Sequence, residues 1–140
     1  MEQNVTRMLD GMIGSTDDPE LRTMLEEHKA ETETQAERLK ARLEAHGESP
    51  SGVREAVGIM GALMKGVADL ARSEKAGRNA RDGYATEHME IAAYELLARV
   101  ATALGDEETA QVAMRNRDEE ERMARRIEST WDRVAVLSLE

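Results

Sequence analysis

Acidic residues and a histidine interrupt the apolar face of several helical segments in this sequence, and they are the residues best suited to chemistry. Glu87 and Glu90 lie three residues apart in the stretch ATEHMEIAAYELL, so a helix places both on one face. His28 and Glu31 have the same spacing earlier in the chain, and Glu120 lies in a later segment. Carboxylate and imidazole groups suit iron and manganese as ligands. The pattern predicts a metal site where these segments meet.

Apolar residues at helical spacing predict four strong helices and a weaker, glycine-rich helix that crosses between the second and the third. Asp17 or Asp18 can cap the second helix, Pro19 suits its first turn, and Gly47 ends it. The expected helices cover roughly residues 2–14, 19–46, 53–70, 80–105 and 106–134.

The face that each long helix is expected to bury is apolar toward its ends and polar in its middle. Glu2 adds an acid to the first helix, three residues before Val5. The expected buried positions are Val5, Met8, Leu9, Met12 and Ile13, then Leu21, Leu25, His28, Thr32, Gln35 and Leu39, then Tyr84, Glu87, Ile91, Tyr94, Ala98 and Ala101, and finally Val112, Asn116, Glu120, Met123, Ile127, Trp131 and Val134.

The polar positions are at similar heights if neighbouring helices run antiparallel. Glu2 lies about 14 residues before the first turn and Glu31 about 14 after it, while Glu90 and Glu120 lie about 15 residues on either side of Gly105. At 1.5 Å per residue, each pair is roughly 20 Å from its turn. A long crossover between the two hairpins would allow all four acids to share the middle of a bundle.

Several carboxylates buried together need neutralisation by shared protons, by Lys or Arg, or by divalent cations. No Lys or Arg falls clearly in the expected faces at that level, and Arg38 and Arg117 are the nearest flanking residues. Metal ions are the simplest explanation, but a solvated face or a proton-sharing polar core fits the same spacing. His88 points about 100° away from Glu87 and suits the surface. Tyr94 fits either core packing or a hydrogen bond to the acids.

The composition narrows the class of protein. The chain has 140 residues, enough for one domain with its own core, and its few aromatic residues favour a helix bundle. A net charge of −10 argues against nucleic-acid binding and against acidic membrane surfaces. The absence of cysteine excludes disulfides and thiolate metal sites. With neither a signal peptide nor an apolar run of about 18 residues, a cytoplasmic location is expected.

Three segments resemble a known family over nearly the whole chain. PELRTMLEEHKAETETQAERL, EHMEIAAY and DEEERMA are similar to segments of the YciE/YciF-type ferritin-like proteins, a bacterial stress-associated family. The resemblance implies a ferritin-like four-helix bundle with an additional crossover helix, usually dimeric, and a dinuclear metal site like that of rubrerythrin. The ligands it implies are Glu2, Glu31 with His28 or Gln35, Glu87 with Glu90, and Glu120. The sequence departs from the ferritin-like pattern at Met123, where that pattern has a histidine.

The leading hypothesis is a single ferritin-like domain, residues 1–140, that binds iron or manganese and forms a homodimer. Its metal ligands would be Glu2, His28, Glu31, Glu87, Glu90 and Glu120. Its chemistry would be iron oxidation or the reduction of peroxide or oxygen. The alternative hypothesis is a non-catalytic stress-related interaction protein, in which the polar residues set helix register and dimer pairing.

Overall fold

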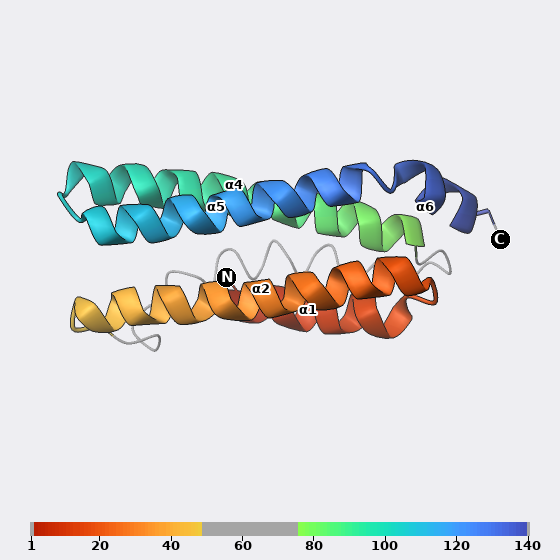
Figure 1. The fold of residues 1–140 in the computed structure, drawn as a ribbon, viewed down its shortest axis with the longest axis horizontal. Helices are drawn as coiled ribbons and strands as arrows, with labels where there is room; N and C mark the ends of the chain where they lie inside the picture. The colour runs from red at the N-terminus through yellow and green to blue at the C-terminus, as the bar shows by residue number, and fades with distance from the viewer. Residues whose placement is uncertain (1, 49–75, 140) are drawn as a thin grey trace. The chain divides into compact units, whose positions relative to one another are not determined.

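The computed structural model describes residues 2–48 and 76–139, and every element within these ranges is an α-helix (Figure 1). The helices are α1 (Glu2–Ser15), α2 (Pro19–Ala45), α4 (Ala76–Ala103), α5 (Glu107–Glu128) and α6 (Trp131–Leu137). The predicted all-α class is confirmed, whereas the predicted crossover helix lies outside the described residues. Within these ranges, no helix is both long enough and apolar enough to cross a bilayer. The chain divides into two compact units, residues 1–73 and 74–140.

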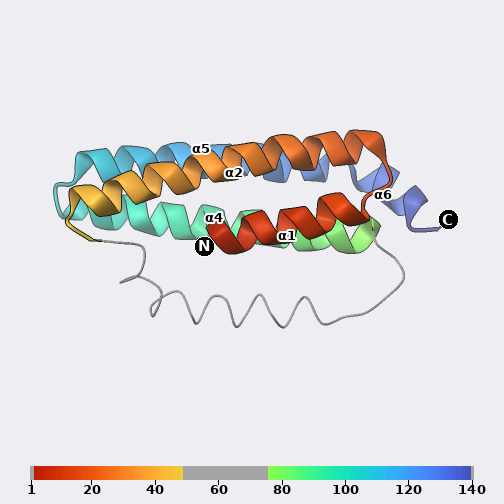
Figure 2. The ribbon, with the colours of Figure 1, turned by 90° about the horizontal axis from the view of Figure 1, so that it is seen from below.

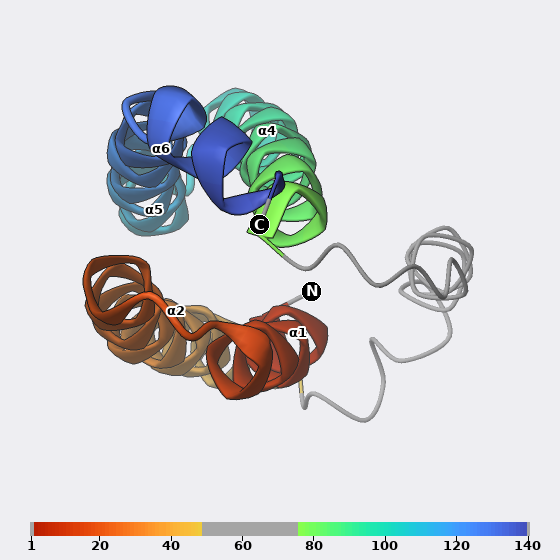
Figure 3. The same ribbon diagram turned by 90° about the vertical axis from the view of Figure 1, so that its right-hand side faces the viewer.

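The first unit contains the hairpin of α1 and α2, which lie side by side (Figures 1 and 3). Because α1 has 14 residues and α2 has 27, α1 pairs with only the first half of α2, which contains His28. Lys29 of α2 forms an ion pair with Asp10 of α1 at 2.6 Å, and this hydrogen bond raises the pKa of Lys29. Within residues 2–48, the buried apolar side chains are Val5, Leu9, Met12, Leu21 and Leu25.

Asp18 caps the start of α2, and it is one of the two residues, Asp17 and Asp18, that the sequence suggested for this role. Its Oδ1 accepts hydrogen bonds from the backbone N–H groups of Glu20 and Leu21, at 3.1 and 3.0 Å. These are two of the donors that have no partner within the helix itself. Pro19 then occupies the first turn, where a missing N–H costs nothing.

We expect Asp18→Ala to lower the free energy of unfolding by about 1 kcal/mol, because both N–H groups lose their acceptor. Urea denaturation followed by circular dichroism measures this loss. Asp17→Ala is the matched control, since Asp17 is exposed and one residue outside the cap. Equal stability losses in the two variants would contradict the role given to Asp18.

The second unit contains the hairpin of α4 and α5, with α6 against α4 (Figures 1 and 2). Gly105 makes the turn with a φ of 75°, and Asp106 caps α5 by accepting from the N–H of Thr109. Gly83 of α4 is buried next to Ile127 of α5, and an added Cβ would lie 3.4 Å from Ile127 Cδ1, an ordinary van der Waals distance. Small residues are frequent among the buried positions of the two helices, namely Ala98, Ala101, Ala110, Ala113 and Ala124.

The prediction of one continuous last helix is wrong, because α5 ends at Glu128 and α6 begins at Trp131. The hydroxyl groups of Ser129 and Thr130 donate to the carbonyls of Arg126 and Ile127, each at 2.7 Å. These local bonds compete with the helical pattern and favour a break. After the break, α6 lies at the end of α4 that is opposite to the Gly105 turn (Figure 1).

The buried faces differ in part from the predicted ones. On α2, all predicted positions from Leu21 to Gln35 are buried, but Leu39 is only half-buried. On α4, the buried face is rotated, so that Glu90 is buried while Ile91 is half-buried. Gly83 is buried where Tyr84 was expected, while Glu87, Tyr94, Ala98 and Ala101 are buried as predicted. The other predicted core positions that are half-buried or exposed are Met8, Ile13, Tyr84, Val112 and Trp131.

Candidate metal centre

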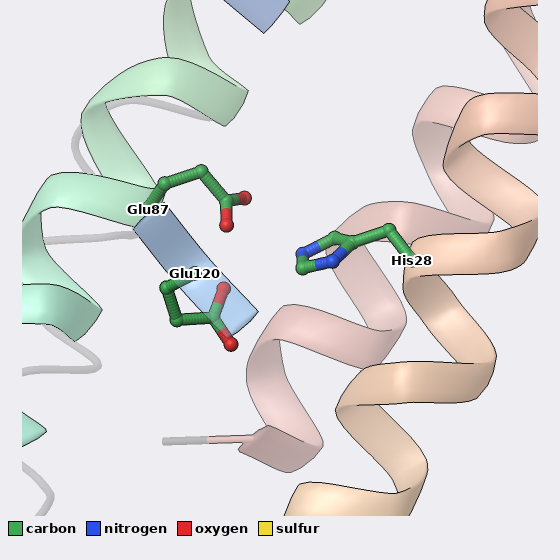
Figure 4. Close-up of side chains that lie close together, drawn as sticks. All are labelled: His28, Glu87 and Glu120. Carbon is green, nitrogen blue, oxygen red and sulfur yellow. The ribbon is translucent and has the colours of Figure 1, made fainter. Parts of the chain in front are cut away.

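Two carboxylates meet between the facing helices of the second unit. Glu87 of α4 and Glu120 of α5 are 1% and 0% exposed, and one oxygen of each lies within 4.8 Å of the other (Figure 4). Glu90, one turn after Glu87, is also only 1% exposed. The turn at Gly105 sets this arrangement, because it places residues at similar distances along α4 and α5 at the same level. The hairpin therefore buries Glu87, Glu90 and Glu120 on its two facing helices.

His28 is the buried histidine of the first unit. It is 1% exposed, and Thr32 and Gln35, which follow on the same face of α2, are both fully buried. The hydroxyl of Thr32 donates to the backbone carbonyl of His28 at 3.0 Å. His28, Glu87 and Glu120 are thus three buried side chains of the types that could hold a metal ion, and Figure 4 draws all three.

Glu31 and Glu2 are the remaining ligands predicted from the sequence. Glu31 has a side chain that is 33% exposed, and its Oε2 lies 3.9 Å from Nδ1 of His28. The side chain of Glu31 is therefore the more exposed of the two. Glu2 is the first residue of α1, and its side chain is outside the described part of the structure.

One buried acid was not predicted from the sequence. Glu119 is 5% exposed, and its Oε1 accepts a hydrogen bond from Nε of Arg115 at 3.2 Å. The spacing of Arg115 and Glu119 by four residues is a recognisable signal for such a pair. Because Arg115 compensates its charge, Glu119 has a separate role from Glu120, its neighbour in the sequence.

Arg117 binds acids on the flank of the hairpin. Its guanidinium donates to Glu95 of α4 and to Asp118, with both contacts at 2.7 Å. Hydrogen bonds from Arg117 and then from Arg99 lower the pKa of Glu95. Hydrogen bonds to Asp118 and then to Glu95 raise the pKa of Arg117. The sequence identified Arg117 as a flanking residue, and the structure gives it this cross-helix role.

We expect Arg117→Gln to raise the pKa of Glu95 toward its ordinary value. The pKa of Glu95 is lowered in the folded state, so its ion pairs stabilise the protein above the unfolded-state pKa. This contribution is lost as the pH falls through the folded-state pKa. Carboxyl titration by NMR measures the change, with Arg126→Gln as the control at an exposed arginine. An unchanged Glu95 titration in Arg117→Gln would contradict the assignment.

His88 lies on the surface, in agreement with the sequence interpretation. Its side chain is exposed, and its ring contacts Tyr84 edge to face with centroids 4.5 Å apart. Tyr84 in turn contacts Trp131 of α6 at 5.7 Å. His88 therefore belongs to an aromatic group at the α4–α6 contact, and not to the buried acids.

Comparison with known proteins gives the family. A family model described as a domain of unknown function, DUF892, matches residues 1–139. The chain therefore belongs to the DUF892 family, which is of the ferritin-like type.

Two solved structures resemble the protein. YcfI from Rhodopseudomonas palustris, for which a structural role has been suggested, is 28% identical, and the match covers 91% of this chain and 83% of that chain with a TM-score of 0.74. A protein from Xanthomonas campestris pv. campestris is 24% identical, over 99% of this chain and 85% of that chain, with a TM-score of 0.79. Both matches are consistent with the four-helix bundle predicted from the sequence.

Proposed function

We propose that the protein is a ferritin-like metal-binding protein whose carboxylate-rich centre takes iron or manganese. Glu87, Glu120, Glu90 and His28 would be its principal ligands, with Glu31 and Glu2 at its edge. The observation that carries this proposal is the burial of Glu87 and Glu120 on facing helices, with oxygens within 4.8 Å of each other.

The electrostatic cost of burying Glu87 and Glu120 close together favours a bound cation between them. Two carboxylate charges within 4.8 Å repel by about 3.5 kcal/mol at an effective dielectric constant near 20. Removing each charge from water costs several kcal/mol more. A divalent cation offsets both terms, because it supplies two positive charges and replaces the lost water molecules as a partner for the carboxylate oxygens.

His28 would complete the centre from the first unit. It lies on α2 three residues before Glu31, in the polar stretch that the sequence analysis assigns to the centre. Its burial beside Thr32 and Gln35 fits an imidazole held in place for a ligand. The carboxylates and one imidazole form a donor set that suits iron or manganese.

Bound iron or manganese would supply one-electron redox chemistry, which is suited to oxidation of ferrous ion or to reduction of peroxide or oxygen. The chain's own contribution is to bury carboxylates on two facing helices near one another. Tyr94, one turn after Glu90 and 1% exposed, closes the same face of α4 and excludes bulk water. A homodimer and a bacterial stress role remain part of this proposal.

The alternative is a non-catalytic protein whose polar residues set helix register and pairing. The structural role suggested for YcfI favours this alternative. Titration of the purified protein with ferrous and manganous ions separates the two, because only the first proposal expects saturable binding that Glu87→Ala removes. The alternative expects Glu87→Ala to alter stability or oligomeric state, with no metal effect in either protein.

A further inference from the structure

A strip of apolar side chains faces solvent along the part of α4 nearest the Gly105 turn. Leu96, Val100 and Leu104, which directly follows α4, are 64%, 47% and 80% exposed, and their spacing of four residues places them on one side of the helix. Scattered exposed apolar residues are ordinary, whereas a contiguous apolar surface marks an interaction site. The outer strip of α4 consists of Met89, Ala92, Ala93, Leu96, Val100 and Leu104, all of them half-buried or exposed.

The outer strip lies on the flank of α4 that α5 does not cover. Measured around the helix from the buried Tyr94, at about 100° per residue, Val100 lies about 120° in one direction and Glu95 about 100° in the other. Glu95 accepts a hydrogen bond from Arg117 of α5 at 2.7 Å, so its flank is the one toward α5. The other helix that packs on α4, α6, lies at the end opposite to the Gly105 turn (Figure 1).

The charges around the outer strip indicate what kind of partner fits it. The strip itself carries no charged side chain, although the chain has a net charge of −10. A basic partner would be recognised by acids around the strip. The nearest exposed or half-buried charged residues on α4, Glu95 and Arg99, instead carry one charge of each sign, four residues apart. A neutral strip with such a pair on its rim suits a second copy of the same acidic chain, because two copies can meet there without like-charge repulsion.

We propose that a second copy of this chain covers the outer strip, with the two α4 helices antiparallel across a two-fold axis. A centre at the level of Ala98 places Leu96 opposite the partner's Val100, and the smaller Ala92 opposite the partner's Leu104. The same symmetry puts Arg99 within about 3 Å, along the helix axis, of the partner's Glu95. Ion pairs on the rim then fix the antiparallel orientation, while the apolar strip supplies the affinity. This inference rests on the proposed function, since it assigns a surface to the homodimer included there.

The test is sedimentation of the full chain over a series of concentrations. A strip on one helix is smaller than the roughly 800 Å² that each partner buries in a standard interface, so we expect a dimer that dissociates on dilution. Leu96→Glu should raise its dissociation constant by about 100-fold or more, because each copy then buries a charge in the contact. Val136→Glu on α6 is the matched control, since Val136 is 59% exposed, and it should leave the dissociation constant unchanged.

Two further variants test the strip and its rim separately. Val100→Glu should weaken the dimer as Leu96→Glu does. Arg99→Glu should raise the dissociation constant by about tenfold, because two symmetry-related rim pairs are lost. The effect of Arg99→Glu should shrink at high salt, whereas that of Leu96→Glu should not. If Leu96→Glu fails to fold by circular dichroism, Val100→Glu and Arg99→Glu decide.

Each result separates the surface from the rest of the proposed function. A dimer that is unchanged in both Leu96→Glu and Val100→Glu would overturn the surface but keep the homodimer. A natural protein that stays monomeric would overturn both. A lower free energy of unfolding in Leu96→Glu with no change in mass would show that another part of the same chain covers the strip, and the inference would be wrong. Titration with Mn²⁺ tests the metal centre independently, and monomeric Leu96→Glu should bind Mn²⁺ as the natural protein does, because its side chain points away from the buried acids.

Discussion

Replacing Glu87 by glutamine is expected to remove metal-dependent stabilisation of the protein. A ligand that binds only the folded state at 100 times its dissociation constant stabilises that state by about 2.7 kcal/mol, which corresponds to roughly 10 °C in Tm for a chain of this size. Loss of a direct ligand should weaken binding by about 100-fold or more, since even residues behind the ligands contribute 10- to 100-fold. At the same metal concentration, the shift in Tm should then fall to about 2 °C or less.

The Glu87→Gln substitution keeps the shape of the side chain and removes only its charge, so its effects are easy to interpret. In the absence of metal, we expect the variant to be as stable as the natural protein or more stable, because a buried charge next to Glu120 is gone. Glu128→Gln on α5 is the matched control, since it makes the same charge change at an exposed position. Thermal unfolding with and without Mn²⁺ gives both quantities. If Mn²⁺ raised the Tm of Glu87→Gln as much as that of the natural protein, the proposed metal centre would be wrong.

Truncating Tyr94 is expected to give the largest loss of stability among single substitutions in the second unit. Among the residues that the structure describes, Tyr94 is the largest of the fully buried side chains, with 1% exposure. Tyr94→Ala removes the ring and leaves a cavity, and comparable truncations cost about 3–5 kcal/mol. That is a large part of the roughly 5–15 kcal/mol that stabilises most domains, so the variant should be close to unfolding at room temperature. Urea denaturation measures the loss.

Two further variants separate packing from hydrogen bonding at this position. Tyr94→Phe keeps the ring and should cost only about 1 kcal/mol. Leu96→Ala is the control on the same helix, because Leu96 is 64% exposed, and it should change the unfolding free energy by less than about 0.5 kcal/mol. A Tyr94→Ala cost similar to that of Leu96→Ala would show that this part of the hairpin is not packed as described.

The sequence predicted the helices well, because their boundaries depend on local chemistry. Asp18, Pro19 and Gly105 act over one or two turns, and they are where the pattern put them. The break after Glu128 was missed since the hydroxyl bonds of Ser129 and Thr130 are weak local signals beside a continuing apolar period.

The buried face of α4 was predicted only in part, because its phase depends on the partner helix. Large apolar side chains suggested Tyr84 and Ile91, but the neighbouring Gly83 and Glu90 are buried instead. On α2, by contrast, the buried face from His28 to Gln35 was predicted correctly. The apolar and polar residues of this helix are compatible with only one orientation of the buried face. Whether these positions bind metal depends on chemistry that spacing alone does not determine.

The break between α5 and α6 also gives the second unit its own optical reporter. Trp131 is the only tryptophan in the chain, and the break places it against Tyr84 at the α4–α6 contact. Intrinsic fluorescence excited at the tryptophan therefore reports the docking of α6 on α4, separately from the helix content seen by circular dichroism. Fraying of the C-terminal helix and melting of the α4–α5 hairpin become two distinguishable signals from one unlabelled protein.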